Sequence, residues 1–207
     1  MAKAEILHIH PEDPQGRLID RVVEVLRKGG IVVHPTDTTY ALGVDMNNKR
    51  GVEMLYQIKK KSLNRPLSFL CKDLSNISEY AMLSNSAFRT MKRLLPGPYT
   101  FILNATKSAP HYTQGNNKEI GIRVPAEPIC HAILDRLDHP LVSTSAYVHG
   151  GDLLADPEEI QHVLGGHADL IIDAGYIWPE PSTIISFVDD EPTLIREGKG
   201  PFEAEMA

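Results

Sequence analysis

Apolar and polar residues alternate along the chain in blocks that predict a succession of helices and strands. Apolar side chains recur at helical spacing over residues 17–28, and the pair Gly29-Gly30 ends that segment. Similar patterns predict helices over residues 49–60, 84–95, 128–137 and 157–164, with a short helix ending at residue 83. Short apolar runs predict strands at residues 31–34, 66–71, 99–103, 120–124, 141–145, 170–172, 183–188 and 193–196. The last ten residues carry no such pattern and are expected to be frayed.

This alternation of strands and helices predicts a fold of the α/β class, with a twisted, open and mixed sheet. We find no internal repeat, no low-complexity segment and no linker in the sequence. The chain is therefore expected to form a single domain over residues 1–207.

The composition narrows the class of protein. The chain is 42% hydrophobic and 23% charged, which is typical of a globular protein and excludes intrinsic disorder. The two cysteines lie in apolar runs and are expected to be buried thiols. No signal peptide and no apolar stretch of about 20 residues is present, so we expect a cytoplasmic protein without a membrane role. The formal net charge of −6 argues against wrapping by nucleic acid but allows a local basic patch.

One basic cluster follows the second predicted helix. Lys59, Lys60 and Lys61 close the helix, and Arg65 lies in the loop before the next strand. These cations could neutralise phosphates, with Arg65 offering two parallel hydrogen bonds. The alternative is that the lysines stay solvated and complement the helix dipole.

Hydroxyl side chains follow two of the predicted strands. Residues 141–145 (LVSTS) turn from apolar to hydroxyl-bearing, and Thr36-Asp37-Thr38-Thr39 follows the strand at 31–34. Ligands collect at the carboxyl ends of strands in open α/β sheets, so both segments are candidates for a binding cleft. In each case the alternative is a local turn stabilised by the hydroxyl groups. Ser143 and Ser145 are expected to point to one side of the sheet.

Arg123 lies inside an apolar strand, where an arginine is rare unless it is paired. It should therefore meet a carboxylate, either of the protein or of a ligand. Farther along, Ser182 precedes one strand and Arg196 closes another.

Several familiar motifs are missing. The sequence has no Walker A loop, no G-x-G-x-x-G turn and no G-x-S-x-G elbow, so no nucleophilic serine and no paired base is expected. His8 and His10 could share one face of a strand, but no third ligand lies near them. We predict no protein-held metal.

Taken together, five segments resemble the YrdC/YciO family of threonylcarbamoyl-adenylate synthases of tRNA modification. They are residues 34–43 (HPTDTTYALG), 95–101 (LPGPYTF), 121–125 (GIRVP), 141–145 (LVSTS) and 181–184 (PSTI). They occur in the family's order, and the resemblance is greatest to the YciO branch. It implies an open twisted sheet with a large concave, basic face.

The resemblance also implies an activity and a set of contacts. Family synthases condense ATP, accompanied by Mg²⁺, with L-threonine and bicarbonate to give threonylcarbamoyl-AMP and pyrophosphate. By position, the residues that would bind the nucleotide are Lys59, Lys61, Arg65, Ser145 and Arg196. Those that would bind threonine are Thr38, Arg123, Ser143 and Ser182, with Arg123 taking the carboxylate. No residue is assigned as a covalent catalyst, because positioning and charge neutralisation suffice.

Three positions differ from the synthase pattern. Lys61 replaces a forked arginine, Tyr147 replaces an asparagine, and Leu70 stands where synthases often carry a histidine that faces the substrate. The alternative function is therefore a non-catalytic module that binds double-stranded or structured RNA with the same basic face.

Overall fold

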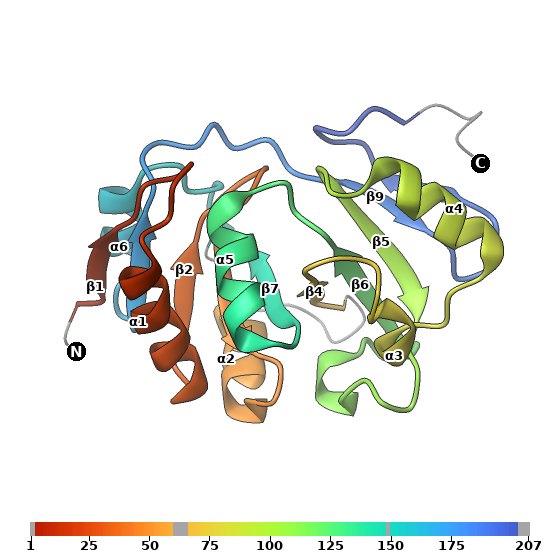
Figure 1. The fold of residues 1–207 in the computed structure, drawn as a ribbon, viewed down its shortest axis with the longest axis horizontal. Helices are drawn as coiled ribbons and strands as arrows, with labels where there is room; N and C mark the ends of the chain where they lie inside the picture. Colours follow the sequence, from red (N-terminus) through yellow and green to blue (C-terminus); the bar gives the residue numbers. More distant parts are fainter. Residues whose placement is uncertain (1–2, 60–65, 148–149, 203–207) are drawn as a thin grey trace.

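A computed structural model describes residues 3–59, 66–147 and 150–202 of the chain. Its strands form one ten-stranded mixed sheet in the order β1-β8-β2-β3-β7-β4-β6-β5-β9-β10 (Figure 1). The strands are β1 (Glu5–His8), β2 (Val32–His34), β3 (Ala41–Asp45), β4 (Ser68–Leu70), β5 (Tyr99–Asn104), β6 (Glu119–Arg123), β7 (Leu141–Ser145), β8 (Leu170–Asp173), β9 (Thr183–Ser186) and β10 (Thr193–Arg196). The mixed α/β sheet expected from the sequence is confirmed. A basic concave face stays a prediction.

The helices are α1 (Gly16–Arg27), α2 (Lys49–Lys59), α3 (Ile77–Tyr80), α4 (Asn85–Leu94), α5 (Pro128–Leu137) and α6 (Pro157–Leu164), with a 3-10 turn at His111–Thr113. The helices at 128–137 and 157–164 have the bounds that the sequence predicts. Each begins with a proline in its first turn and is capped by an acidic side chain, from Glu127 and Asp156 respectively. Ser84 caps α4, as expected, by accepting a hydrogen bond from the Ala87 amide.

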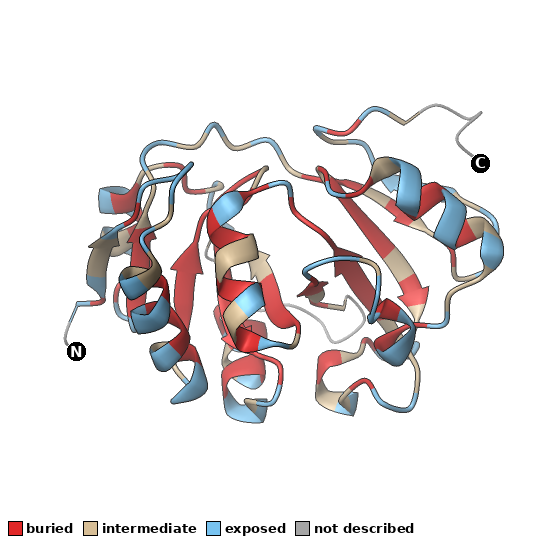
Figure 2. Ribbon diagram, viewed as in Figure 1, coloured by how far each residue is buried: buried red, intermediate tan, exposed pale blue. Residues whose placement is uncertain are grey.

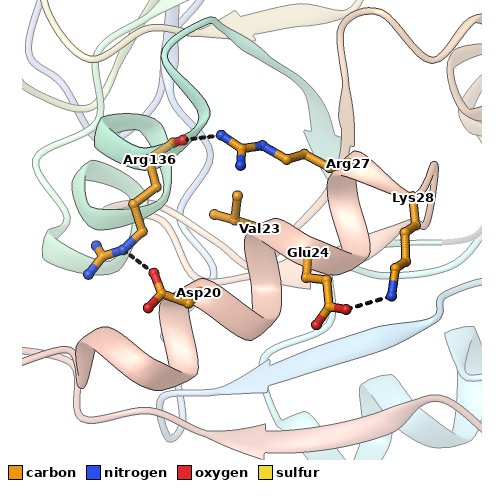
Figure 3. Close-up of a pocket in the computed structure, with 6 residues that line it drawn as sticks. All are labelled: Asp20, Val23, Glu24, Arg27, Lys28 and Arg136. Atoms are coloured by element: carbon orange, nitrogen blue, oxygen red, sulfur yellow. Dashed lines mark hydrogen bonds and ion pairs between the residues drawn. The ribbon is translucent and has the colours of Figure 1, made fainter.

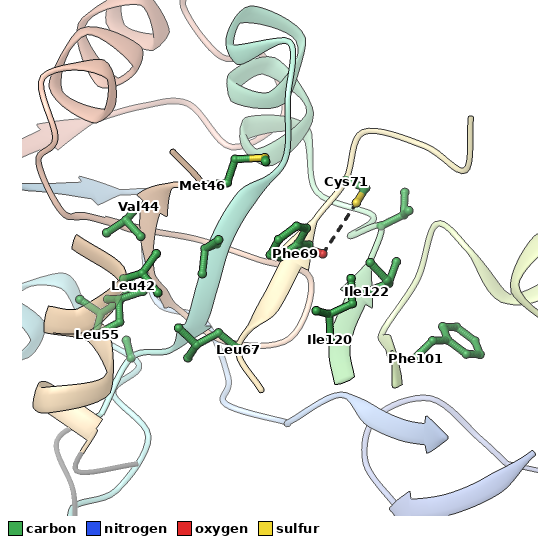
Figure 4. Close-up of a cluster of buried hydrophobic side chains, with 14 of the residues drawn as sticks. Leu42, Val44, Met46, Leu55, Leu67, Phe69, Cys71, Phe101, Ile120 and Ile122 are labelled. Carbon is green, nitrogen blue, oxygen red and sulfur yellow. Dashed lines mark hydrogen bonds between the residues drawn. The ribbon is translucent and has the colours of Figure 1, made fainter. Parts of the chain in front are cut away.

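Helices pack on both faces of the sheet, because successive strand residues point to opposite sides. Val32 packs with α1, α5 and Leu170 in one apolar cluster, whereas its neighbour Val33 belongs to the other cluster with residues of α2 and α6. Figure 2 shows that the central strands are buried, whereas the edge strands β1 and β10 and the outer surfaces of the helices are exposed at many positions. The larger cluster runs the width of the central strands, from Leu42 and Leu55 to Phe101 (Figure 4).

Two strands were not expected from the sequence. β3 is entirely buried and pairs antiparallel with β2 and β7. Its sequence pattern did not indicate a strand, because it contains a glycine and follows a polar turn. β1 pairs with β8 at the edge of the sheet and ends at His8. The idea that His8 and His10 share a strand face was therefore wrong: His8 pairs with Asp173, and His10 accepts hydrogen bonds from the amides of the following turn.

Candidate functional site

The register of the central strands gathers polar and small residues on one face of the sheet. Ser143 of β7 lies opposite Ser68 of β4, and Ser68 lies opposite Gly121 of β6. Paired residues project to the same side, and Arg123 is two positions beyond Gly121 on β6. Ser143 and Arg123 therefore lie on the same face of the sheet.

Arg123 is held by the turn that follows β2. Its Nη2 donates to Oδ1 of Asp37 at 2.8 Å and to Oγ1 of Thr38 at 3.0 Å. The side chains of Arg123 and Asp37 are each 9% exposed. Burial lowers the pKa of Arg123, and the Asp37 carboxylate opposes that shift. Arg123 thus meets a carboxylate of the protein, the first of the two partners considered from the sequence.

The Nε of the Arg123 guanidinium is a buried donor without an acceptor among the described residues. A buried N–H that lacks a partner is costly, so this group would gain from an acceptor supplied by a ligand.

The turn at residues 36–39 is a hydroxyl-stabilised turn, which was one of the alternatives considered for this segment. Oγ1 of Thr36 accepts from the amides of Thr38 at 3.2 Å and Thr39 at 3.1 Å. Asp37 also accepts from the Ala126 amide at 3.2 Å, and its carbonyl accepts from Lys199 at 2.7 Å. The local turn is therefore part of the site, because it places the side chains of Asp37 and Thr38 within hydrogen-bond distance of Arg123.

Ser182, which directly precedes β9, and Arg196, at the end of β10, form a second group. Oγ of Ser182 lies 2.8 Å from Oγ1 of Thr100, and Nη2 of Arg196 donates to the Ser182 carbonyl at 2.6 Å. Burial lowers the pKa of Arg196, the positive charge of Arg123 lowers it further, and Tyr147 raises it. The Arg123 guanidinium and the Tyr147 phenol therefore each lie within electrostatic range of Arg196.

Lys59 ties the end of α2 to the end of β7. Its Nζ donates to the carbonyl oxygens of Ser145 at 2.7 Å and Tyr147 at 2.9 Å, and it lies over the Tyr147 ring. Lys59 is buried. Its contacts with the two carbonyl oxygens and the Tyr147 ring therefore stabilise this corner of the sheet, in addition to any role toward a ligand. Lys61 and Arg65, also predicted to bind the nucleotide, lie outside the described residues.

Ser143 has an imidazole neighbour that the sequence did not indicate. Nε2 of His34 lies 3.3 Å from Oγ of Ser143. His34 is fully buried, and burial lowers its pKa to about 4. An imidazole of such low basicity is a poor general base at neutral pH, so the pair gives no support to a nucleophilic serine.

Glu127 is another site residue that the sequence did not single out. Its carboxylate accepts from the Cys130 amide at 2.7 Å at the start of α5. Burial raises the pKa of Glu127 to about 7, and the nearby Asp37 adds to the shift. Leu70, in contrast, is buried in the apolar cluster beneath α1 and α5, as its type suggests. Cys71 and Cys130 are buried free thiols, as expected.

Other features of the described chain involve none of the predicted site residues. Two cavities are lined by none of the predicted site residues; the larger, of about 450 Å³, lies between α1 and α5 (Figure 3). There Arg136 donates to Asp20, and Arg27 donates to the Arg136 carbonyl. The described residues contain no group of three or more His, Cys, Asp or Glu side chains that could hold a metal ion. No described helix is long and apolar enough to cross a membrane.

Comparisons with known proteins identify relatives of the chain. Residues 24–198 match the family model of Sua5, YciO and YrdC proteins, which is described as telomere recombination. The chain is 43% identical to YciO of Escherichia coli over 199 residues, 95% of this chain and 97% of that protein. It is 34% identical to a putative threonylcarbamoyl-AMP synthase of Methanocaldococcus jannaschii over 206 residues, 97% of this chain and 96% of that protein.

Solved structures share the fold. The crystal structure of E. coli YciO matches with a TM-score of 0.92 at 42% identity, covering 96% of this chain and 97% of that one. The crystal structure of P. abyssi Sua5 in complex with L-threonine matches with a TM-score of 0.87 at 24% identity, covering 93% of this chain and 57% of that one. The chain therefore belongs to the Sua5/YciO/YrdC family.

Proposed function

We propose that the chain is a threonylcarbamoyl-AMP synthase, a nucleotidyltransferase of tRNA modification. In this reaction the amine of L-threonine, after losing a proton to solvent, attacks the carbon of bicarbonate, and water leaves to give a carbamate. A carbamate oxygen then attacks the α-phosphorus of ATP, and pyrophosphate leaves. The protein contributes by holding together three reactants that each carry a negatively charged group, and no covalent intermediate with the chain is needed.

The observation that carries the proposal is the unfilled donor of Arg123. Its Nε is buried without an acceptor among the described residues, while Nη2 is engaged by Asp37 and Thr38. A threonine carboxylate would satisfy Nε and would share the positive charge with Asp37. The hydroxyl groups of Thr38, Ser143 and Ser182 are the candidates for the remaining polar atoms of threonine. A relative of the same fold, P. abyssi Sua5, has been crystallised with L-threonine, which supports this choice of ligand.

The nucleotide is assigned to the neighbouring cations. Arg196 lies within electrostatic range of Arg123, so phosphates bound there would lie beside the threonine carboxylate and would relieve the repulsion between the two guanidinium groups. Ser145 lies at the end of β7, and the hydrogen bond from Lys59 of α2 to its carbonyl oxygen brings the lysine charge to that end of the strand. Lys61 and Arg65 complete the proposed set. Mg²⁺ would arrive with ATP as part of the substrate.

The experiment that tests the proposal is pyrophosphate release from ATP, measured at high enzyme concentration with L-threonine and bicarbonate present together or omitted in turn. We expect release that requires both, and a loss of at least tenfold in Arg123→Ala. A matched control is Arg89→Ala on α4, outside the site. Release that is independent of threonine, or absent at high enzyme concentration, would contradict the proposal.

Binding of double-stranded RNA by a basic face stays the alternative prediction. It requires an affinity that falls steeply with salt, because phosphate contacts release counterions. An affinity for a short RNA duplex that stays constant between low and moderate salt would exclude this alternative. The same would follow if neutralising Lys59, Lys60 and Lys61 together left the affinity unchanged.

A further inference from the structure

His34 lies behind Ser143 in a position that determines how the serine hydroxyl can point. One ring nitrogen, Nε2, lies 3.3 Å from Oγ of Ser143, and the other, Nδ1, lies 3.0 Å from the carbonyl oxygen of Pro35. A carbonyl oxygen can only accept a hydrogen bond, so Nδ1 must carry a proton. The contact with Pro35 therefore selects the tautomer of the imidazole.

The imidazole carries only that one proton at neutral pH. The ring is fully buried, and burial lowers its pKa to about 4, with a smaller contribution from the positive charge of Arg123. Nε2 is then an unprotonated acceptor, and the hydrogen of the Ser143 hydroxyl is the one that fills the contact. A hydroxyl has a single hydrogen, so the Ser143 oxygen keeps only acceptor capacity toward anything else.

The ring is fixed in this orientation by its neighbours. A Cβ at Gly43 would lie 2.9 Å from Cδ2 and 3.0 Å from Nε2 of His34, so the ring packs directly against the bare glycine backbone. On its other side, Sγ of Cys130 lies 3.6 Å from Nδ1 and donates to the Pro35 carbonyl at 3.1 Å. The imidazole has no room to flip without moving β3 or α5.

We propose that His34 is a positioning residue that turns the Ser143 hydroxyl into an obligatory acceptor, so that the site selects a ligand presenting an N–H or O–H donor to Ser143. This inference rests on the proposed function, because Ser143 lies on the same face as Arg123. The ligand class is either a zwitterionic amino acid or a hydroxy acid. Its carboxylate would bind Arg123, and its N–H or O–H group would donate to Ser143.

The first test measures the tautomer in the ligand-free protein. Long-range ¹H–¹⁵N correlation spectra of the imidazoles, with His34→Gln used to assign the signal, should show His34 as the neutral Nδ1–H form from pH 5.5 to 8. A signal of the Nε2–H form, or of a doubly protonated ring at pH 7, would overturn the inference whether or not the protein binds threonine.

The second test measures selectivity by calorimetry with three ligands: L-threonine, L-2-aminobutyrate without the hydroxyl, and (R)-3-hydroxybutyrate without the ammonium. One of the two analogues lacks the group that donates to Ser143, and we expect the wild type to bind threonine more tightly than that analogue. Since one hydrogen bond to a charged or polar group is at stake, the preference should be about tenfold or more. His34→Phe, which removes the acceptor, should lose that preference, and His34→Gln, which keeps an acceptor, should restore much of it.

The two tests separate the inference from the proposed function. If the wild type binds threonine and His34→Phe keeps the same preference while remaining folded by circular dichroism, the inference is wrong and the function survives. If the wild type binds none of the three ligands, the proposed function fails, and the selectivity assigned to Ser143 fails with it.

Discussion

Arg123 and Asp37 form a buried ion pair that joins β6 to the turn after β2. Nη2 of the arginine lies 2.8 Å from Oδ1 of the aspartate, and each side chain is 9% exposed. The sequence separates the two residues widely, so this contact links distant parts of the chain at the candidate site.

Removing the carboxylate of this ion pair should destabilise the protein. In Asp37→Ala the buried guanidinium loses its counter-charge, and we expect a loss of about 3 kcal/mol in the free energy of unfolding, measured with urea. Arg123→Met together with Asp37→Ala should be less destabilised than the sum of the two single variants. Additive losses would contradict a direct interaction between the two side chains.

Glu127 should make stability depend on pH around neutrality. Its folded-state pKa is raised to about 7 from an ordinary value of 4.5, so the native state holds a proton that the unfolded state releases between these values. Its contribution to stability is therefore fully present below about pH 4.5 and is lost as the pH rises through 7.

Glu127→Gln removes this titration while keeping an oxygen that can accept from the Cys130 amide. Thermal unfolding followed between pH 5 and 8 should show a flatter profile for the variant than for the wild type. The control Glu158→Gln, in the first turn of α6, should leave the profile unchanged. Parallel profiles for the wild type and Glu127→Gln would mean that Glu127 is ionised throughout this range.

Gly43 should tolerate no side chain. A Cβ there would lie 2.7 Å from Cδ2 of Leu141 and 3.0 Å from Nε2 of His34, both of them buried. Gly43→Ala should therefore cost about 1–3 kcal/mol in the free energy of unfolding and should disturb the His34–Ser143 contact. Gly166→Ala is the matched control, because a Cβ at Gly166 meets nothing within 4 Å. Equal stability of the two variants would show that β3 shifts easily.

Lys59 should matter to stability even without a ligand. Its ammonium donates to the carbonyl oxygens of Ser145 and Tyr147, which Lys59→Met would leave without this partner. We expect a loss of about 2 kcal/mol in urea unfolding. Lys49→Met, at the exposed start of the same helix, should change stability by less than about 0.5 kcal/mol, since its pair with Glu53 is exposed. A loss no larger than that of the control would assign Lys59 to ligand binding alone.

Most helices were predictable because their signals are local. The cap and the first-turn proline of α5 and α6 lie within a few residues of the apolar pattern that they begin, so both helices have their predicted bounds. β3 could not be found in this way. It is buried on both faces, so it has no alternation of polar and apolar residues, and its glycine suggested a turn.

The types of residue in the candidate site could be predicted from the sequence, but the residues with which they pair could not. The sequence indicated that Arg123 needs a carboxylate, yet only the fold brings Asp37 to it across 86 positions of the chain. The pairing of His34 with Ser143 likewise depends on the register of β2, β3 and β7, which a single sequence does not contain. Lys199 carried no local signal, because its partner, the Asp37 carbonyl, comes from another segment.

The claim on which the account depends is that Arg123 binds the carboxylate of the ligand through its unfilled buried donor. Calorimetric titration of the wild-type protein with L-threonine and with L-threoninamide, in which an uncharged amide replaces the carboxylate, tests it most directly. We predict binding of threonine, weakening of at least tenfold for the amide, and no difference between the two ligands in Arg123→Met. Equal binding of threonine and its amide by the wild type, or no binding of threonine, would contradict the account.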